Sequence, residues 1–540
     1  GIRYATEFHM TNDSKLFPPR PKWEADGYRP DEYSRWLKGN WRPIEELWAE
    51  LGVDPTKPRP AEFELEEWLF NTNAGLEERT ARIQYVHGHL LKPGDVHRTD
   101  WRIRCAQPPY DSLPIPRADI PPGIILSREA DAWIKEEQIE DTALPLYEGR
   151  MIGQFDFSQK GWVSGKGRGA QWTDIDWENK CLHPQYLMST ATFLNSSNYV
   201  PFPKASLIAI VSATNTRGFI CAPIPNHPCS HPVPVFRSDS GVLSFTLSQS
   251  AVLNSLAFDW CFRARLGSGV MYVSPYLLNE SPIPSIIQNH VVNISAICAS
   301  LALCSQVFSV EWLSLTSPRF RVNSAWRIIS QWSMTHMERL RLRCMLDALI
   351  AAQFNLRASD FEWVLRECDN QRESLQRESA AGALSPKGFW RVDKDKDPEL
   401  RHTVLTLVAF HDLEEKIRAC GGDREKGIEA FLNQNDGEGW LLPETLCLTD
   451  YGLGHDERAK HPQPVASRLG PRFYDWQLAQ SPEESWRECR LHARNLLGEI
   501  GYLRLLEEIE SPKDGQKAPQ VAEPSLAYSH SQGKQGKLFE

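Results

Sequence analysis

Short apolar runs alternate with glycine, proline, asparagine and serine between residues 144 and 284. Runs of this length, bounded by residues that form turns, are typical of β-strands. The pattern therefore predicts a mostly β, irregular domain, and the apolar residues 207–211 are expected to form one of its buried strands. The runs on which this prediction depends are QYLMSTATF, SLIAIVSA, GFICAPIP and GVLSFTLS.

One helical pattern interrupts this β-rich region, at residues 251–267 (AVLNSLAFDWCFRARLG). Val252, Leu256 and Trp260 recur every four residues, which places them on one side of a helix. Arg263 and Arg265 then lie at the C-terminal end of that helix. Basic side chains at such a position either face a ligand or simply interact with the helix dipole, and the residues alone leave both interpretations open.

After the β-rich region the apolar spacing becomes helical, as in the recurrence of Leu342, Leu346 and Leu349. The most apolar window of the chain, residues 291–310, is interrupted by asparagine, glutamine and several serines. A membrane-spanning helix needs a longer run of apolar residues without such interruptions. We therefore expect a buried helix in this window and no contact with a membrane.

The two ends of the chain differ from its middle. Residues 1–140 are rich in tryptophan and proline, and residues 98–127 are dense enough in proline to be extended. From about residue 511 the chain is polar and poor in large apolar side chains, so we expect it to be disordered. The first residue is Gly1, and the chain begins as though in mid-sequence. We expect a piece of a longer protein, with a processed terminus as the alternative.

Composition and charge narrow the class of protein. With 540 residues, 41% hydrophobic and 24% charged, the chain resembles a globular protein of three or four domains. Its 12 cysteines form no CxxC pair, which argues against a zinc ribbon or a disulfide framework and fits a reducing cytoplasm. The net charge of −10 does not indicate a nucleic-acid binder. Between Arg150 and Arg217, however, seven Lys and Arg stand against four Asp and Glu, so DNA contact is permitted there.

This locally basic stretch and the helix that follows it hold the side chains that we expect to contact DNA. Lys166 and Arg168 alternate with glycines at 165, 167 and 169, whose backbone is able to approach a phosphate closely. Asn215 and Arg217 follow the expected strand, where asparagine reads adenine and arginine reads guanine in the major groove. The alternative is a turn, in which Asn215 satisfies backbone groups and Arg217 pairs with an acid. The predicted DNA-contacting residues are Arg150, Lys160, Lys166, Arg168, Asn215, Arg217, Arg263 and Arg265.

Two short motifs match parts of a methyl-transfer site, but their surroundings argue against that function. Residues 107–110 (QPPY) match the loose form of the amino-methyltransferase signature, which acts on a flipped base from the end of a buried strand. Two arginines precede this tetrapeptide where apolar residues should lie. The GxGxG of residues 165–169 lacks both the preceding apolar strand and the ribose-binding acid of a cofactor site. We therefore predict no catalytic residue and no bound cofactor in this chain.

Four possible metal ligands, Cys221, His227, Cys229 and His231, lie within eleven residues of one another. Prolines interleave them, and no second pair has the spacing of a zinc finger. We therefore expect no metal site in this segment.

Three blocks of the β-rich region, residues 144–169, 204–225 and 248–269, together resemble the target-recognition region of large adenine-specific DNA methyltransferases. These are the enzymes of restriction–modification and phage-defence systems. Asp347-Ala348 is similar to a dipeptide in the helix pair that closes their recognition region, and residues 387–417 resemble part of their C-terminal extension. Family members transfer a methyl group from S-adenosylmethionine to the N6 of adenine. The resemblance implies double-stranded DNA and a catalytic methyltransferase domain or subunit as partners, with S-adenosylmethionine bound outside this chain.

These expectations combine into an α+β chain, with an irregular mostly β recognition domain between helical regions. We expect residues 1–140 to connect to a missing catalytic domain, 141–285 to recognise DNA, 286–385 and 386–510 to be helical, and 511–540 to be disordered. The alternative is a non-catalytic scaffold subunit that binds other defence-system proteins without reading DNA. An enzyme of another class is disfavoured, since the sequence holds no Ser/His/Asp motif, P-loop or paired metal carboxylates.

Overall fold

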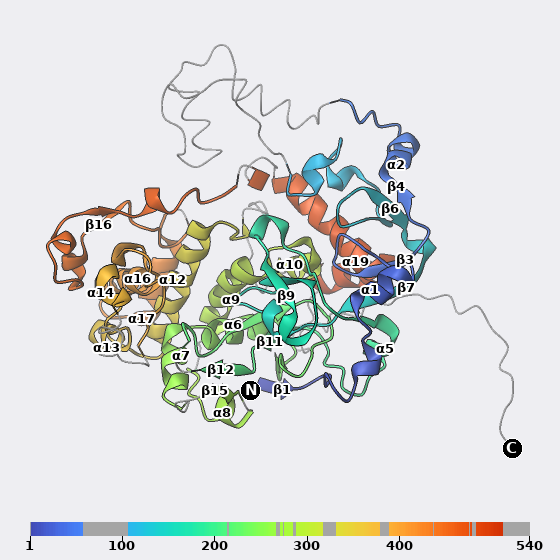
Figure 1. Cartoon of the computed structure of the whole chain (residues 1–540). Helices are drawn as coiled ribbons and strands as arrows, with labels where there is room; N and C mark the ends of the chain where they lie inside the picture. Colours follow the sequence, from blue (N-terminus) through green and yellow to red (C-terminus); the bar gives the residue numbers. More distant parts are fainter. Residues whose placement is uncertain are drawn as a thin grey trace, which may run out of the picture.

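The computed structural model describes residues 2–57, 106–212, 215–265, 270–273, 275–284, 288–316, 331–377, 388–435, 437–474, 476–477 and 482–510. Helices and small antiparallel sheets alternate through these ranges, so the chain is an α+β protein, as the sequence predicts (Figure 1). The predicted disorder of residues 511–540 concerns a segment outside the described residues.

The central sheet combines the first residues of the chain with the predicted recognition region. Its strands, in spatial order, are β1 (Ile2–Ala5), β14 (Val235–Ser238), β11 (Lys204–Leu207) and β13 (Cys221–Ile224). Beyond β1, the carboxylate of Glu7 forms an ion pair of 2.7 Å with Lys204, and both side chains are fully buried. The Glu7 carboxylate also accepts a hydrogen bond from the backbone N–H of Cys229. The start of the chain is therefore built into this sheet.

Of two further sheets, one joins residues from both sides of position 140, where we expected a domain boundary. This sheet has the order β10 (Leu187–Ser189), β7 (Ile139–Pro145), β3 (Trp36–Gly39) and β2 (Arg29–Pro30). The other has the order β4 (Arg42–Pro43), β6 (Ala132–Lys135) and β5 (Ile124–Leu126). Since β7 pairs with β10 on one side and with β3 on the other, the connector and the recognition region share backbone hydrogen bonds.

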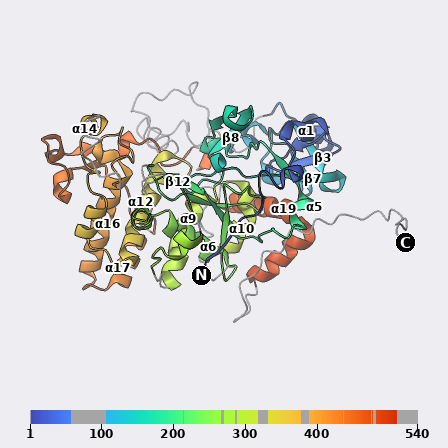
Figure 2. The ribbon, with the colours of Figure 1, turned by 60° about the horizontal axis from the view of Figure 1, so that its bottom comes forward.

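Helices cover the central sheet and extend from it to one end of the molecule (Figures 1 and 2). α6 packs on strands of the central sheet and on α9, α9 packs on α12, and α12 packs on α16, which also contacts α17. The helices of this part of the molecule are α6 (Leu243–Leu253), α7 (Leu256–Arg263), α8 (Pro275–Asn279), α9 (Gln288–Ala302), α10 (Ser309–Leu315), α12 (His336–Gln353), α13 (Ala358–Val364), α14 (Arg372–Gln376), α16 (His402–Ala419) and α17 (Arg424–Asn433). Beside this helical end lies a two-stranded sheet of β16 (Thr445–Leu446) and β17 (Gln463–Pro464).

The last described helix, α19 (Pro482–Glu510), lies at the other end of the molecule, beside the N-terminal sheets (Figure 2). It packs on α10, and its Asn495 donates a hydrogen bond of 3.2 Å to the hydroxyl of Tyr33. The predicted helical extension of residues 386–510 is spatially divided, because α16 packs with α12 and α17 whereas α19 packs with α10. Between α17 and α19 the described residues include the strands β16 and β17. Short helices α1 (Arg20–Ala25), α2 (Ile44–Leu51) and α5 (Thr190–Leu194) complete this end.

Two predicted elements are each divided in the structure. The helix expected at 251–267 is split between α6 and α7, because Asn254 forms hydrogen bonds with the backbone of Cys221. Ser255 then caps α7 by accepting a hydrogen bond from the N–H of Phe258. The strand expected at 207–211 is likewise interrupted, since β11 ends at Leu207 and a separate strand, β12 (Ile210–Ser212), pairs with β15 (Val270–Tyr272).

The most apolar window contains α9 and α10, both of which pack against other helices. Across the described ranges, no helix combines the length and the apolar character that crossing a membrane requires. The prediction of a buried helix in this window is therefore confirmed.

Candidate nucleic-acid interface

A two-stranded hairpin carries three of the predicted DNA-contacting residues, and a fourth, Arg150, lies beside it. Its strands are β8 (Lys160–Ser164) and β9 (Gln171–Asp174), and Trp162 lies opposite Trp172 in the register. The glycine-rich turn between them requires glycine at position 165, where φ is +80° and a Cβ would lie 2.4 Å from the carbonyl oxygen of Gly169. The GxGxG motif thus closes a hairpin.

The turn presents Lys166 and Arg168 to solvent, and neither forms an ion pair with any residue that the structure describes. Arg150 is also exposed, donates a hydrogen bond of 3.3 Å to the carbonyl of Ala170, and lies 5.9 Å from the ring of Trp172. Lys160 forms an ion pair of 3.3 Å with Asp174 across the hairpin, and this pair partly neutralises the charge of Lys160. The hairpin tip is therefore a locally cationic surface of the kind that contacts phosphates.

The hairpin is held against the body of the protein by its aromatic and amide contacts. The guanidinium of Arg20 lies 4.6 Å from the ring of Trp162. The side-chain amide of Gln185 and the indole N–H of Trp162 both donate to the carbonyl oxygen of Gly165. These contacts restrict the loop, so the two exposed cations are presented from a defined backbone.

Acidic side chains limit how far a phosphate backbone could follow this surface. At the base of the hairpin, a cavity of about 450 Å³ is lined by several carboxylates as well as by Arg128 and Lys180. The acids around it are Asp31, Glu32, Glu129, Asp174, Asp176 and Glu178. Because these carboxylates repel phosphates, the tip of the hairpin is better suited to contact DNA than the end of the hairpin next to the cavity.

Arg217 and Arg263, in contrast, lie inside the protein and do not reach a DNA-binding surface in this structure. Arg217 is 5% exposed and its guanidinium donates a hydrogen bond of 3.1 Å to Nδ1 of His402. Arg263 is 1% exposed; it forms an ion pair of 3.2 Å with Asp259 and donates to the carbonyl of Thr216. The predicted contacts of these two arginines with DNA are therefore corrected to structural contacts, and the hydrogen-bond partner of Arg217 is His402 rather than the acid that the alternative interpretation expected.

His402 is the centre of this buried cluster. Its Nδ1 accepts a second hydrogen bond, from Arg343, and its Nε2 lies 2.8 Å from a carboxylate oxygen of Asp347. Burial and the positive charge of Arg343 lower the pKa of His402 to about 4, so the ring is neutral and accepts from both arginines. The other carboxylate oxygen of Asp347 accepts from the N–H of Leu256, the first residue of α7. Asp347 of the Asp-Ala dipeptide thus connects α12 to α7 and α16.

The remaining two predicted residues are exposed but lie outside the hairpin. The backbone N–H of Asn215 donates to the carbonyl of Ser212, so Asn215 lies in a turn with its side chain exposed. The Arg265 guanidinium donates to the carbonyl of Cys261 at the C-terminal end of α7. This contact fits the helix-capping interpretation of Arg265. Asn215 stays a candidate for reading a base.

The tetrapeptide at 107–110 does not form a base-binding site. Tyr110 is 1% exposed, and its hydroxyl donates a hydrogen bond to the carboxylate of Glu32. Glu32 also forms a fully buried ion pair of 2.8 Å with Arg117. The aromatic ring that would stack on a flipped base is therefore part of a core, not of the extended, proline-rich segment that we expected.

The four possible metal ligands have separate contacts. His231 accepts a hydrogen bond of 3.3 Å from the N–H of Met10, and its ring stacks on His9. Cys221 and Cys229 are buried thiols, and burial raises the pKa of both. Within the described part of the chain, no group of three or more His, Cys, Asp or Glu side chains has the arrangement of a metal site.

Comparison with protein families, with curated proteins and with solved structures finds no match for this chain.

Proposed function

We propose that this chain is the DNA target-recognition portion of a site-specific adenine-N6 DNA methyltransferase. It would act in the cytoplasm, in a restriction–modification or phage-defence system, and the domain that binds S-adenosylmethionine would lie outside this chain. The observation that carries the proposal is the hairpin of β8 and β9, which presents Lys166 and Arg168 from a glycine turn anchored on two sides. The order of the blocks that resemble the recognition region supports it.

In this proposal the exposed cations at the hairpin tip position the duplex, and recognition of bases falls to other exposed side chains. Lys166, Arg168 and Arg150 lie on one small surface, which suits contacts to neighbouring phosphates. Such contacts carry no sequence information. Asn215 is an exposed amide in a turn, and an amide of this kind pairs with adenine in the major groove.

The test is the salt dependence of DNA binding by the full chain and by a Lys166→Ala, Arg168→Ala double variant. Each phosphate contact contributes about −0.9 to the slope of log K against log salt. The slope of the double variant should therefore be less steep than that of the wild type by about one to two. The matched control is Arg357→Ala, Lys426→Ala, which removes two exposed cations from the helical region. A slope that is the same in the wild type and the hairpin variant would contradict the proposed interface.

A second experiment tests whether the catalytic domain lies outside this chain. Labelled S-adenosylmethionine should neither bind to the isolated chain nor transfer its methyl group to DNA. Micromolar binding of the methyl donor to this chain alone would contradict that part of the proposal and would return attention to Gln107.

A scaffold subunit is the second candidate, and one exposed apolar surface favours it. Ile210 in β12 and Tyr272 in β15 are paired across the two-stranded sheet and are 56% and 46% exposed. Tyr276, in the neighbouring α8, is 67% exposed. Exposed aromatic and aliphatic side chains next to one another are typical of protein-binding surfaces. If this candidate is right, the partner binds with little dependence on salt and the chain alone shows no affinity for DNA.

A further inference from the structure

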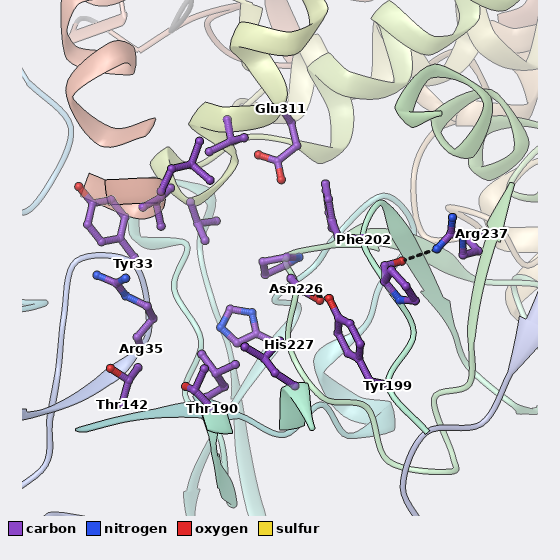
Figure 3. Close-up of a pocket in the computed structure, with 18 of the residues that line it drawn as sticks. Tyr33, Arg35, Thr142, Thr190, Tyr199, Phe202, Asn226, His227, Arg237 and Glu311 are labelled. Carbon is purple, nitrogen blue, oxygen red and sulfur yellow. Dashed lines mark hydrogen bonds between the residues drawn. The ribbon is translucent and has the colours of Figure 1, made fainter. Parts of the chain in front are cut away.

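A cavity of about 450 Å³ lies where elements from most of the chain meet (Figure 3). Residues from β7, α5, the loop after β13, α10 and α19 line it. Its volume is within the range of small-molecule binding sites, which are mostly apolar with a few polar groups in defined positions. The apolar side chains around it include Leu144, Leu194, Tyr199, Phe202, Val310 and Leu497.

Six polar side chains that line the cavity carry buried atoms without a hydrogen-bond partner among the described residues. These atoms are Oε2 of Glu311, both ring nitrogens of His227, Oδ1 of Asn226, Oγ1 of Thr190, Nη2 of Arg35 and Nε of Arg237. Glu311 is 6% exposed and His227 is 4% exposed. Figure 3 shows the Glu311 carboxyl pointing from its helix into the space above His227 and Asn226. Leaving a buried polar atom without a partner costs about 1–3 kcal/mol, so a ligand that supplies partners is stabilised here.

The orientation of the Asn226 amide is fixed by one contact. Its Nδ2 donates a hydrogen bond of 3.1 Å to the hydroxyl of Tyr199. The carbonyl oxygen of the amide is therefore the atom that remains to accept from a ligand. With Glu311, the cavity has an acceptor and a carboxyl group on facing walls.

The two titratable groups at the polar centre of the cavity, Glu311 and His227, are uncharged near neutral pH. Burial raises the pKa of Glu311 to about 8, so its carboxyl is protonated and both donates and accepts. Burial lowers the pKa of His227 to about 3, so its ring is a neutral imidazole. Charged side chains also line the cavity. Arg35 is paired with Asp31 at 2.7 Å, Arg237 donates a hydrogen bond to the carbonyl of Pro201, and Arg504 and Glu508 belong to α19. The polar centre of the cavity therefore suits an uncharged ligand with a donor next to an acceptor.

We propose that this cavity binds a planar, uncharged nitrogen heterocycle of the nucleobase type, such as adenine, free or as its nucleoside. A ring nitrogen and the adjacent amino group would pair with the two oxygens of the Glu311 carboxyl. The rings of Phe202 and Tyr199 offer apolar surface to the face of the base. A second donor on the ligand would pair with Oδ1 of Asn226.

The structure favours the free base, and not a base within duplex DNA, as the ligand of this cavity. None of the eight predicted DNA-contacting residues lines this cavity. The proposal is therefore independent of the proposed DNA interface, and each can fail without the other.

The test is calorimetric titration of the full chain with adenine, with unsubstituted purine as the matched ligand because it lacks the amino group. Adenine should bind more tightly than purine. Glu311→Leu should weaken adenine binding about tenfold or more, because it removes both hydrogen-bonding atoms. Glu311→Gln keeps a donor and an acceptor and should retain most of the affinity. His227→Phe provides a second variant in case Glu311→Leu does not fold, and circular dichroism checks the fold of each.

Two outcomes would overturn the proposal. One is the absence of heat at millimolar adenine, and the other is equal adenine affinity in the wild type and in a folded Glu311→Leu variant. A third arm titrates duplex DNA that contains 2-aminopurine. If Glu311→Leu changes binding of this duplex but adenine itself does not bind, the source is a DNA base and the proposal for a free base is wrong.

Discussion

Cationic side chains occupy two contrasting regions of this molecule. At the hairpin of β8 and β9, Lys166 and Arg168 point into solvent from a glycine turn. Around His402, Arg217, Arg263 and Arg343 are enclosed between α7, α12 and α16 and contact acids, carbonyls and the imidazole. The local sequence does not distinguish these buried arginines from arginines that contact DNA. What decides is whether another layer of the fold covers the residue.

The two regions also differ in what their charges contribute to stability. Exposed ion pairs contribute about 0–1 kcal/mol, since water screens them. A buried charge that loses its partner costs about 3–5 kcal/mol, because it has already lost its hydration. Substitutions in the buried cluster should therefore affect folding, and substitutions in the hairpin should affect DNA binding.

The largest effect is expected from Asp259→Ala. This substitution removes the partner of Arg263 and the acceptor of the Gly218 N–H, both of which are buried. We expect the free energy of unfolding to fall by about 3–5 kcal/mol, measured by urea denaturation. The control is Asp174→Ala, which breaks the exposed pair with Lys160 and should change stability by no more than about 0.5 kcal/mol. Equal effects of the two substitutions would remove the distinction between the regions.

A smaller effect is expected from Arg217→Ala. The variant loses a charged hydrogen bond to His402, and we expect stability to fall by about 1.5–3 kcal/mol. The salt slope and the sequence preference of DNA binding should not change in the folded fraction, because the side chain is buried. A changed recognition sequence in methylation-site sequencing of the reassembled enzyme would show that Arg217 reaches DNA after all.

A buried acid, Glu311, whose Oε2 has no hydrogen-bond partner among the described residues, sharpens the comparison further. Between its ordinary pKa of 4.5 and its folded value of about 8, Glu311 keeps its proton in the folded state and loses it in the unfolded state. The unfolded state then binds fewer protons, so stability falls as pH rises through this window, by about 1 kcal/mol per pH unit. Glu311→Gln cannot ionise and should lack this loss. Denaturation at pH 5.5 and 7.5 measures it, and parallel pH profiles of the two proteins would contradict the prediction.

The sequence predicted the types of element well and their connections poorly, for a physical reason. Apolar spacing is local, so the β-rich region, the helices after it and the buried helix in the window 291–310 were all visible in it. The pairing of β1 with β14 and the break between α6 and α7 depend on residues far apart in the chain. Single-residue patterns carry no information on such contacts.

The candidate site shows the same division. Glycines on either side of Lys166 and Arg168 indicated an exposed turn, since glycine offers no side chain with which to pack. The burial of Arg217 depends on His402, which belongs to α16 and lies far from Arg217 in the sequence. The i, i+4 spacing of Asp259 and Arg263 was the one local signal of a structural ion pair. Glu311 was missed, although an acid among apolar residues in α10 is a sign of a buried functional group.

The smallest effect, and the closest test of the hairpin, compares Gly165→Ala with Gly167→Ala. Both glycines have positive φ, of +80° and +54°, which costs a residue with a side chain about 1 kcal/mol. At Gly165 a Cβ would also collide with the backbone of Gly169, whereas nothing lies within 4 Å of one at Gly167. We expect Gly165→Ala to distort the turn and weaken DNA binding by up to about tenfold, and Gly167→Ala to weaken it less. Titration of fluorescent duplex DNA with each variant measures this. If Gly165→Ala binds DNA as the wild type does, the geometry of this turn does not position the cations, and the exposed region acts by charge alone.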